Sequence, residues 1–186
     1  MKKLLRCGWV SDDPLYISYH DQEWGKPCRD NRHLFEMICL EGQQTGLSWI
    51  TILKKRQNYR DAFFQFNPEK IGNMTDEDIQ QQLNNSGIIR NKSKIQAIVK
   101  NAKAYLAMQE NGENFADFIW SFAPENPVLV RHEDYRNYPA QTQESEQMSK
   151  ALKKKGFVYV GPVVCYAFMQ AVGLVDDHSK SCFCAK

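Results

Sequence analysis

The stretch that decides the fold runs from Leu83 to Lys92 and reads Leu-Asn-Asn-Ser-Gly-Ile-Ile-Arg-Asn-Lys. Just before it, Thr75 and Asp78 have the spacing of a helix-capping box, which predicts a short helix that ends at Leu83. After it, apolar residues recur at helical steps of three and four: Ile95, Ile98, Val99, Ala102, Tyr105 and Leu106. The sequence therefore predicts two helices joined by a short turn that contains Gly87.

This turn has the features of an anion-binding site. The first backbone N–H groups of the second helix have no partner within the helix, and they attract negative charge. Arg90, Lys92 and Lys94 add positive charge beside them. A DNA phosphate would fit there without any reading of bases. An ordinary helical hairpin whose basic residues face solvent explains the same pattern equally well.

Helical periodicity covers most of the remaining chain. Leu34, Met37 and Ile38 lie on one apolar helix face, and a second helix is expected from Leu47, after a break at Gly46. Shorter helices are expected at residues 115–119, 149–155 and 162–172. A strand-like pattern occurs at residues 156–160, and the polar residues 123–145 are expected to form a long surface connection. The predicted fold class is all-α.

The bulk composition is that of an ordinary soluble globular protein. The 186 residues suffice for one large domain or two small ones, and the net charge of +2 does not by itself indicate a nucleic-acid partner. No apolar run approaches the ~20 residues that cross a bilayer, so no membrane partner is expected. Asp12 and Asp13 follow the basic start, so we expect no signal peptide and a cytoplasmic location.

Two cysteines and two histidines near the ends of the sequence make a complete tetrahedral ligand set for zinc. They are Cys7, His20, His178 and Cys182. Four protein ligands leave no open position, so this zinc would be structural and would join the N- and C-terminal segments. A zinc hydrolase would need an open position for water and is less favoured. Cys184 is a further metal candidate, since disulfides are rare in reducing cytosol.

Aromatic residues gather in the sequence on both sides of Glu41. Four of them lie between residues 9 and 24, and Trp49 follows Glu41. Core packing explains most aromatic residues, and Glu41 could be an exposed acid at a helix end. If the rings instead surround Glu41, they form an electron-rich slot with a carboxylate, which favours a cationic aromatic ligand.

Several longer strings strongly resemble the type I 3-methyladenine DNA glycosylases, and the resemblance spans nearly the whole chain. The matching strings are Arg6-Cys7-Gly8-Trp9-Val10, Tyr19-His20-Asp21-Gln22-Glu23-Trp24-Gly25, Leu34 to Gln44, Gly46-Leu47-Ser48-Trp49, Gly87-Ile88-Ile89-Arg90-Asn91, Lys94-Ile95, Ser121-Phe122, Phe168-Met169-Gln170-Ala171 and Asp177-His178. The resemblance implies a helix-hairpin-helix glycosylase fold with a structural zinc. Residues 1–186 would form one glycosylase unit with two lobes, a hairpin-bearing helical lobe at about 30–122 and a zinc-binding lobe from the terminal segments.

The resemblance also implies roles for individual residues. Glu41 would be the catalytic acid group, and Trp9, Tyr16, Tyr19 and Trp49 would bind the base. Tyr19 and Glu41 would make polar contacts to the base, and Trp49 would stack on it. The implied DNA-binding residues are Gly46, Leu47, Gly87, Arg90, Lys92 and Lys94. The zinc ligands would be the four named above, with Cys184 as an alternative to Cys182. Residues 123–145 match no family motif, so no functional role is expected there.

The implied activity is that of a monofunctional DNA glycosylase. It would hydrolyse the N-glycosylic bond of 3-methyladenine in alkylated double-stranded DNA, release the free base and leave an abasic site. We expect it to act as a monomer. A zinc-stabilised helix-hairpin-helix module that binds DNA without catalysis is the alternative, but that reading leaves an acid among aromatic residues unexplained.

Overall fold

The computed structural model describes residues 4–128 and 130–185, and these contain helices but no strands. The α-helices are α1 (Pro14–Gln22), α2 (Asn31–Gln44), α3 (Trp49–Ala62), α4 (Pro68–Gly72), α5 (Asp76–Leu83), α6 (Lys92–Glu110), α7 (Phe115–Trp120), α8 (Gln143–Lys154) and α9 (Pro162–Ala171). Two short 3-10 turns, η1 (Phe64–Phe66) and η2 (Tyr135–Asn137), complete the described elements. The all-α prediction is therefore confirmed.

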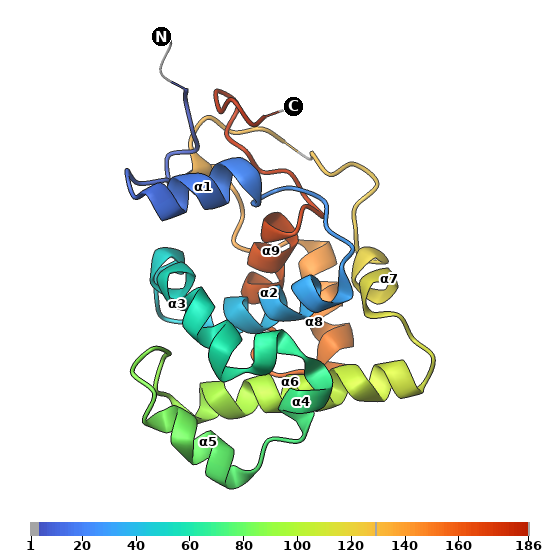
Figure 1. Ribbon diagram of the computed structural model, residues 1–186. Coiled ribbons are helices and arrows are strands. Elements are labelled where there is room, and N and C mark those ends of the chain that lie inside the picture. The colour runs from blue at the N-terminus through green and yellow to red at the C-terminus, as the bar shows by residue number, and fades with distance from the viewer. Residues whose placement is uncertain (1–3, 129, 186) are drawn as a thin grey trace.

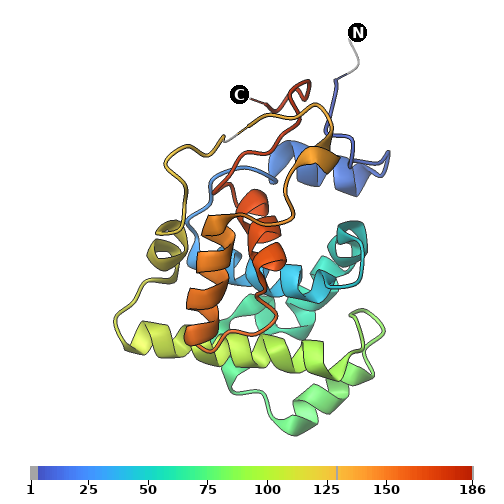
Figure 2. The same ribbon diagram turned by 180° about the vertical axis from the view of Figure 1, so that it is seen from behind.

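Helix α2 forms the centre of the core. Every residue from Leu34 to Gln43 is buried, so this helix is covered on all sides. Figures 1 and 2 show α2 and α9 in the middle of the molecule, with α6 crossing beneath them and α1 at the opposite end. Because α2 is fixed by packing all round, the side chains of its last turns have well-defined positions.

The helices on either side of the Leu83–Lys92 turn form as predicted. The side chain of Thr75 accepts the Asp78 N–H at 3.2 Å, and the Asp78 carboxylate accepts the Thr75 N–H at 2.7 Å. Helix α5 then runs to Leu83, and α6 begins at Lys92. Lys55 of α3 donates to the Ser86 carbonyl at 3.1 Å and thereby ties the turn to the body of the protein.

Some helix boundaries differ from the sequence-based expectation. Helix α3 begins at Trp49 rather than Leu47, because Ser48 has an extended backbone and acts as the N-cap. Gly46 has φ +79°, a conformation that favours glycine, and Leu47 lies on the exposed turn. Helix α8 begins at Gln143, well before the expected 149, and residues 156–160 are irregular chain rather than a strand.

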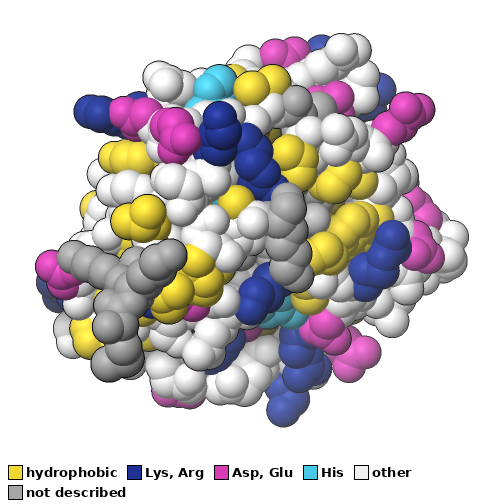
Figure 3. Space-filling view, turned by 90° about the horizontal axis from the view of Figure 1, so that it is seen from above, with side chains coloured by type: hydrophobic (Ala, Val, Ile, Leu, Met, Phe, Trp, Pro, Cys, Tyr) yellow, Lys and Arg dark blue, Asp and Glu magenta, His cyan; other side chains and the backbone are white. Residues whose placement is uncertain are grey.

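The N- and C-terminal segments lie side by side at the end of the molecule that carries α1 (Figures 1 and 2). Phe183 donates its N–H to the Leu5 carbonyl at 2.9 Å. Seen from this end, basic and acidic side chains are interspersed across the surface (Figure 3). None of the helices in the described part of the chain has the length and apolar character needed to cross a membrane.

Candidate active site

A cavity of about 330 Å³ opens between α1, α2, α9 and the segment around η2, and this size is typical of small-molecule sites. The structure brings together around it all five side chains for which a base-contacting role was predicted. They are Trp9, Tyr16, Tyr19, Glu41 and Trp49. Their distribution over the N-terminal segment, α1, α2 and the start of α3 explains why no local pattern reveals the pocket.

The aromatic rings of the pocket contact one another at angles rather than in one flat stack. The centroids of Trp9 and Tyr16 lie 5.0 Å apart, and those of Tyr19 and Trp49 lie 5.5 Å apart. The indole Nε1 of Trp49 is buried and has no hydrogen-bond partner among the described residues. A buried indole N–H normally has a partner, so this donor is available to a bound molecule.

Glu41 is the acid of this pocket. It is only 5% exposed, and its side chain forms no hydrogen bond or ion pair with any described residue. Burial raises the pKa of Glu41 to about 8. Burial, and after it the charge of an ionised Glu41, also raises the pKa of Tyr16 to about 12. At neutral pH the free protein therefore holds Glu41 largely protonated, and a cationic ligand would favour its ionisation.

A second buried acid, Asp177, lines the same pocket with different surroundings. Its Oδ2 accepts a hydrogen bond from the Tyr166 hydroxyl at 2.5 Å and another from Gln170 Nε2 at 2.8 Å. Two donors already hold this carboxyl, so Asp177 supports the pocket wall. Of the two acids, Glu41 is the one that has no partner among the residues the structure describes.

A cluster of histidine and cysteine side chains lies between the terminal segments. The ligand atoms of His20, His178, Cys182 and Cys184 all lie within 4.8 Å of one another. The Nε2 of His20 is 3.4 Å from the Sγ of Cys182. The Nε2 of His178 is buried without a hydrogen-bond partner among the described residues, so it is free to bind a metal.

Carboxylates orient both imidazoles of the cluster. His20 Nδ1 lies 2.8 Å from an oxygen of Asp21, and His178 Nδ1 lies 2.7 Å from an oxygen of Asp176. Each imidazole therefore carries its proton on Nδ1, and the lone pair of its Nε2 can coordinate a metal. Zinc sites in which a carboxylate holds the other ring nitrogen of a histidine ligand have the same arrangement. The donor set therefore fits a zinc ion.

Cys7, the remaining predicted ligand, is buried beside this cluster but is not one of its four mutually close ligand atoms. Its Sγ accepts the Ser179 N–H at 3.3 Å. Cys184 occupies the fourth place in the cluster, and it is less buried than Cys7. His20, His178 and Cys182 thus have the predicted proximity, while two cysteines compete for the fourth position.

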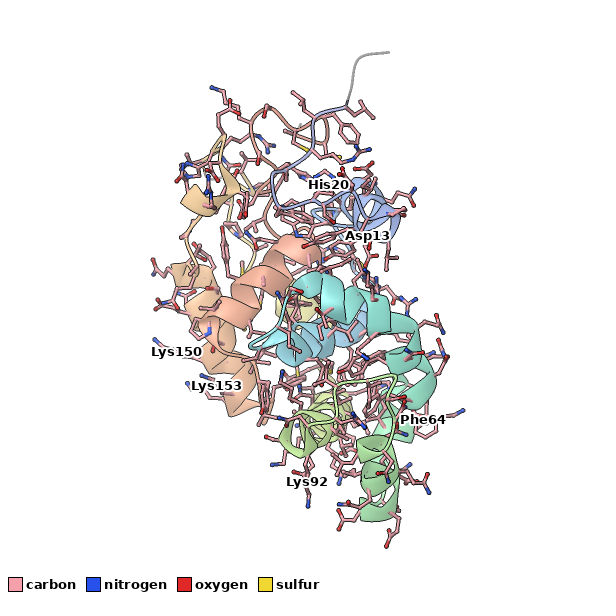
Figure 4. The ribbon with its side chains drawn as sticks, turned by 90° about the vertical axis from the view of Figure 1, so that its left-hand side faces the viewer. Asp13, His20, Phe64, Lys92, Lys150 and Lys153 are labelled. Carbon is pink, nitrogen blue, oxygen red and sulfur yellow. The ribbon has the colours of Figure 1, made fainter. Side chains whose placement is uncertain are left out.

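The predicted DNA-binding residues fall into two groups. Gly46 and Leu47 form an exposed turn that lines a second, adjoining cavity, and this cavity shares Glu41 and Gln44 with the aromatic pocket. The turn therefore lies at the rim of the pocket. Arg90 and Lys92 are exposed at the hairpin and form no ion pair with any described residue. Figure 4 shows Lys92 projecting from the end of the molecule opposite His20.

Lys94 does not match its predicted role as a phosphate ligand. It is only 8% exposed. Its ammonium group donates to the Gln43 carbonyl at 2.8 Å and to the Thr45 carbonyl at 2.7 Å. Its charge and its place beside Lys92 favoured a phosphate contact, but the ammonium group instead joins α6 to the end of α2 inside the protein.

Comparison with known proteins identifies the family. The family model described as methyladenine glycosylase matches residues 9–185 of the chain. The chain belongs to the methyladenine glycosylase family. The match includes every predicted site residue except Cys7, which precedes it.

Individual members of the methyladenine glycosylase family are similar over the full length. A DNA-3-methyladenine glycosylase of Haemophilus influenzae is 59% identical over 96% of this chain and 97% of its own. A crystal structure of a 3-methyladenine DNA glycosylase I superposes with a TM-score of 0.95 at 58% identity, covering 98% of this chain and all of the other. A tyrosine-to-phenylalanine variant of such an enzyme, solved in complex with 3-methyladenine, has a TM-score of 0.90 at 38% identity, with 96% of each chain covered.

Much of the pocket wall could not be assigned from the sequence of this methyladenine glycosylase family member. The residues for which no contact was predicted are Gln44, Tyr135, Tyr138, Pro139, Ala140, Val163, Tyr166, Ala167, Gln170 and Asp177. Gln44, Gln170 and Asp177 lie within family strings, which is a usable signal. Tyr135 to Ala140 lie in the connection for which no role was expected, so that expectation was wrong: this segment forms one wall of the pocket.

Proposed function

We propose that this protein is a monofunctional DNA glycosylase that removes 3-methyladenine from alkylated double-stranded DNA. It hydrolyses the N-glycosylic bond, releases the free base and leaves an abasic site. Membership of the methyladenine glycosylase family supports the reaction class. The relative solved with 3-methyladenine bound supports the identity of the base.

The observation that carries the proposal is Glu41, a buried acid in an aromatic pocket that has no hydrogen-bond or ion-pair partner among the described residues. A carboxyl group left alone in such surroundings costs stability unless a ligand completes it. A base methylated at N3 is a cation with an exocyclic amine. It supplies both the positive charge and the hydrogen-bond donors that an ionised Glu41 requires.

The same pocket explains how damaged bases are selected. The methylated base is already a good leaving group because of its positive charge, so selection and positioning are the main tasks of the enzyme. The nucleotide leaves the stack at a cost of a few kcal/mol, which is smaller for a damaged base. The aromatic faces then stabilise the cation by roughly 2 kcal/mol once water is excluded. Neutral adenine lacks this contribution and stays in DNA.

Bond cleavage proceeds through an oxocarbenium-like state at the sugar, which water attacks as the base departs. Ionised Glu41 holds the base in this step. No lysine lines the described pocket, so no amine is placed to form a Schiff base with the sugar. The proposed enzyme therefore leaves the DNA strand intact.

On the DNA, the α5–α6 turn serves as the helix-hairpin-helix element. Arg90 and Lys92 contact the phosphate backbone, and Gly46 and Leu47 face the gap that the extruded base leaves. These four residues are exposed, and the two cations form no ion pair within the part of the chain that the structure describes, which supports this assignment.

The deciding experiment is a released-base assay on methylated duplex DNA. Chromatography of the soluble fraction resolves 3-methyladenine from 3-methylguanine and 7-methylguanine. We expect enzyme-dependent release of 3-methyladenine, intact strands, and strand breaks only after alkali treatment of the abasic sites. Binding to the DNA without any released base would favour the non-catalytic DNA-binding module instead.

We also propose that Cys7, His20, His178 and Cys182 hold a structural zinc. Orientation of both imidazoles by carboxylates and the free Nε2 of His178 support it. The fourth ligand is identified by measuring the zinc content and the thermal unfolding of two variants, Cys7→Ser and Cys184→Ser. We expect Cys7→Ser to lose zinc and stability, and Cys184→Ser to retain both. The reverse result would assign Cys184, and a Cys7→Ser protein that folds normally but loses only catalysis would indicate a catalytic metal.

A further inference from the structure

Lys94 is a buried cation that forms no ion pair with any described residue, and the function proposed above gives it no task. The hairpin cation Lys92, two residues earlier, is exposed, so neighbouring lysines of one helix turn have opposite surroundings. The polar contacts of the Lys94 ammonium group are the two carbonyls at the end of α2. Burial lowers the pKa of Lys94, which shows that the fold keeps this ammonium at a cost.

One of these two carbonyls, that of Gln43, belongs to the last turn of α2. The last carbonyls of a helix have no partner within it. At α2, Gly42 accepts from the Thr45 side chain at 3.0 Å and Gln44 accepts from the Leu47 N–H at 2.7 Å. Lys94 takes the Gln43 carbonyl. Helix α2 has no basic residue in its own last turn, so Lys94 also supplies the cation that the helix dipole favours there.

The second carbonyl, that of Thr45, belongs to the exposed turn formed by residues 45–47. Gly46 in this turn has φ +79°, and a Cβ at that position would meet nothing within 4 Å. The turn is exposed, and besides its hydrogen bonds to Gly42 and Gln44 it is held by the hydrogen bond from Lys94 to the Thr45 carbonyl. Glu41 lies one helical turn earlier on α2, where packing on all sides fixes the helix, so the contact from Lys94 acts on the turn rather than on the pocket acid itself.

A chain of hydrogen bonds extends from this contact to the hairpin. The Ile89 N–H donates to the Tyr59 hydroxyl at 3.2 Å, and that hydroxyl donates to Gln43 Oε1 at 3.2 Å. Gln43 Nε2 in turn donates to the Lys94 carbonyl at 2.9 Å. The hairpin turn, the start of α6 and the end of α2 are therefore held in one buried polar network.

We infer that Lys94 is a positioning residue that fixes the turn of residues 45–47 at the rim of the pocket and couples it to the DNA-binding hairpin. The inference rests on the proposed function. Docking of the hairpin on the phosphate backbone then sets where Leu47 meets the duplex and where Glu41 meets the extruded base. The ammonium group acts on protein carbonyls and never contacts DNA.

The test compares Lys94→Met with the matched variant Lys92→Met, which alters the exposed lysine of the same turn. Three quantities are measured: single-turnover excision from methylated duplex DNA, affinity for free 3-methyladenine by tryptophan fluorescence, and the salt dependence of DNA affinity. For Lys94→Met we expect excision to fall about tenfold or more through misplacement of the turn. We expect free-base affinity within twofold of the wild type and an unchanged salt slope. In Lys92→Met, the plot of log K against log salt should instead become less steep by about 0.9, the value for one phosphate contact.

Each contrary result has a definite meaning. A smaller salt dependence of DNA affinity in Lys94→Met would show that Lys94 binds a phosphate. A loss of free-base affinity as large as the loss of excision would show that Lys94 only stabilises the pocket. Unchanged excision would also overturn the inference. If Lys94→Met does not fold, Tyr59→Phe interrupts the same network at its other end. It should lower excision two- to threefold without changing free-base affinity. Wild-type protein that releases no base would reject the proposed function itself, whatever the variants do.

Discussion

Helix α2 carries two buried acids with opposite surroundings. Glu36 is 6% exposed and forms two ion pairs. Its Oε1 lies 2.5 Å from Arg56 Nε and 2.8 Å from Arg60 Nη2. Glu41, 5% exposed and little more than one turn further along, has no partner among the described residues. Burial of the two side chains is nearly the same, so exposure alone does not distinguish them.

The difference between Glu36 and Glu41 shows which of the two buried acids stabilises the fold. A buried ion pair is tolerated when both partners are present, because each compensates the desolvation of the other. Glu36 fulfils this condition and joins α2 to α3. Glu41 does not, and the fold leaves its carboxyl facing a cavity. An acid kept in this state is a candidate for ligand binding rather than for stability.

The largest expected effect comes from removing the charge of Glu41. Glu41→Gln should lower single-turnover excision of 3-methyladenine about 1,000-fold, or roughly 4 kcal/mol, because an amide cannot balance the cationic base. Fold and zinc content should be unchanged, as circular dichroism and elemental analysis can verify. Wild-type excision rates in this variant would remove Glu41 from the mechanism.

The matched change at Glu36 should affect stability instead. Glu36→Gln leaves Arg56 buried with one fewer carboxylate and should lower the free energy of unfolding by about 3 kcal/mol, measured in urea. Excision per folded molecule should stay within a few-fold of the wild type. A variant that is stable but inactive would show that the two acids do not divide their roles in this way.

The raised pKa of Glu41 predicts a pH dependence of the reaction. A carboxyl with a pKa of about 8 is protonated below that pH and ionised above it. Because the cationic base needs the ionised form, kcat/KM should rise roughly tenfold between pH 7 and pH 9. The Glu41→Gln variant serves as the control and should lack this inflection. A flat wild-type profile from pH 6 to 9 would contradict the assignment.

The smallest effect is expected at the outer partner of Glu36. The side chain of Arg60 is 32% exposed, so water screens its ion pair more than that of Arg56. Arg60→Met should cost less than about 1 kcal/mol of unfolding free energy, measured in the same urea titration, and should leave excision unchanged. A loss as large as that of Glu36→Gln would mean that Arg60, rather than Arg56, is the main partner.

Local signals allowed much of the helical framework to be predicted from the sequence. The Thr75–Asp78 capping box and the polar turn before Lys92 are complete within a few residues, and the predicted end of the first helix at Leu83 and the long helix after the turn are confirmed. The start of α3 was predicted two residues early, because an apolar Leu47 fits the helical period although its backbone belongs to a turn. Periodicity records which residues are apolar and does not record where a cap interrupts the helix.

The burial of Lys94 and the pocket wall that contains Tyr135 and Tyr138 could not be predicted from the sequence, for a different reason. Lys94 and Gln43 are 51 residues apart, and only the packing of α6 against α2 converts a basic residue into a helix cap. The segment that carries Tyr135 and Tyr138 has no periodic pattern at all. Its course follows from contacts with the C-terminal segment, such as the hydrogen bond from the Tyr138 hydroxyl to the His178 carbonyl at 3.2 Å.

The pairing of the two terminal segments has a consequence for synthesis on the ribosome. Tyr16 and Tyr19 emerge early, but the residues that fix α1 in place, around His178 and Cys182, are translated more than 150 residues later. The aromatic residues of α1 therefore lack these C-terminal contacts throughout most of the elongation of the nascent chain. Polypeptides truncated before Cys182 should lack base-excision activity. Such truncated chains should also be bound by chaperones and degraded by proteases more readily than the full chain.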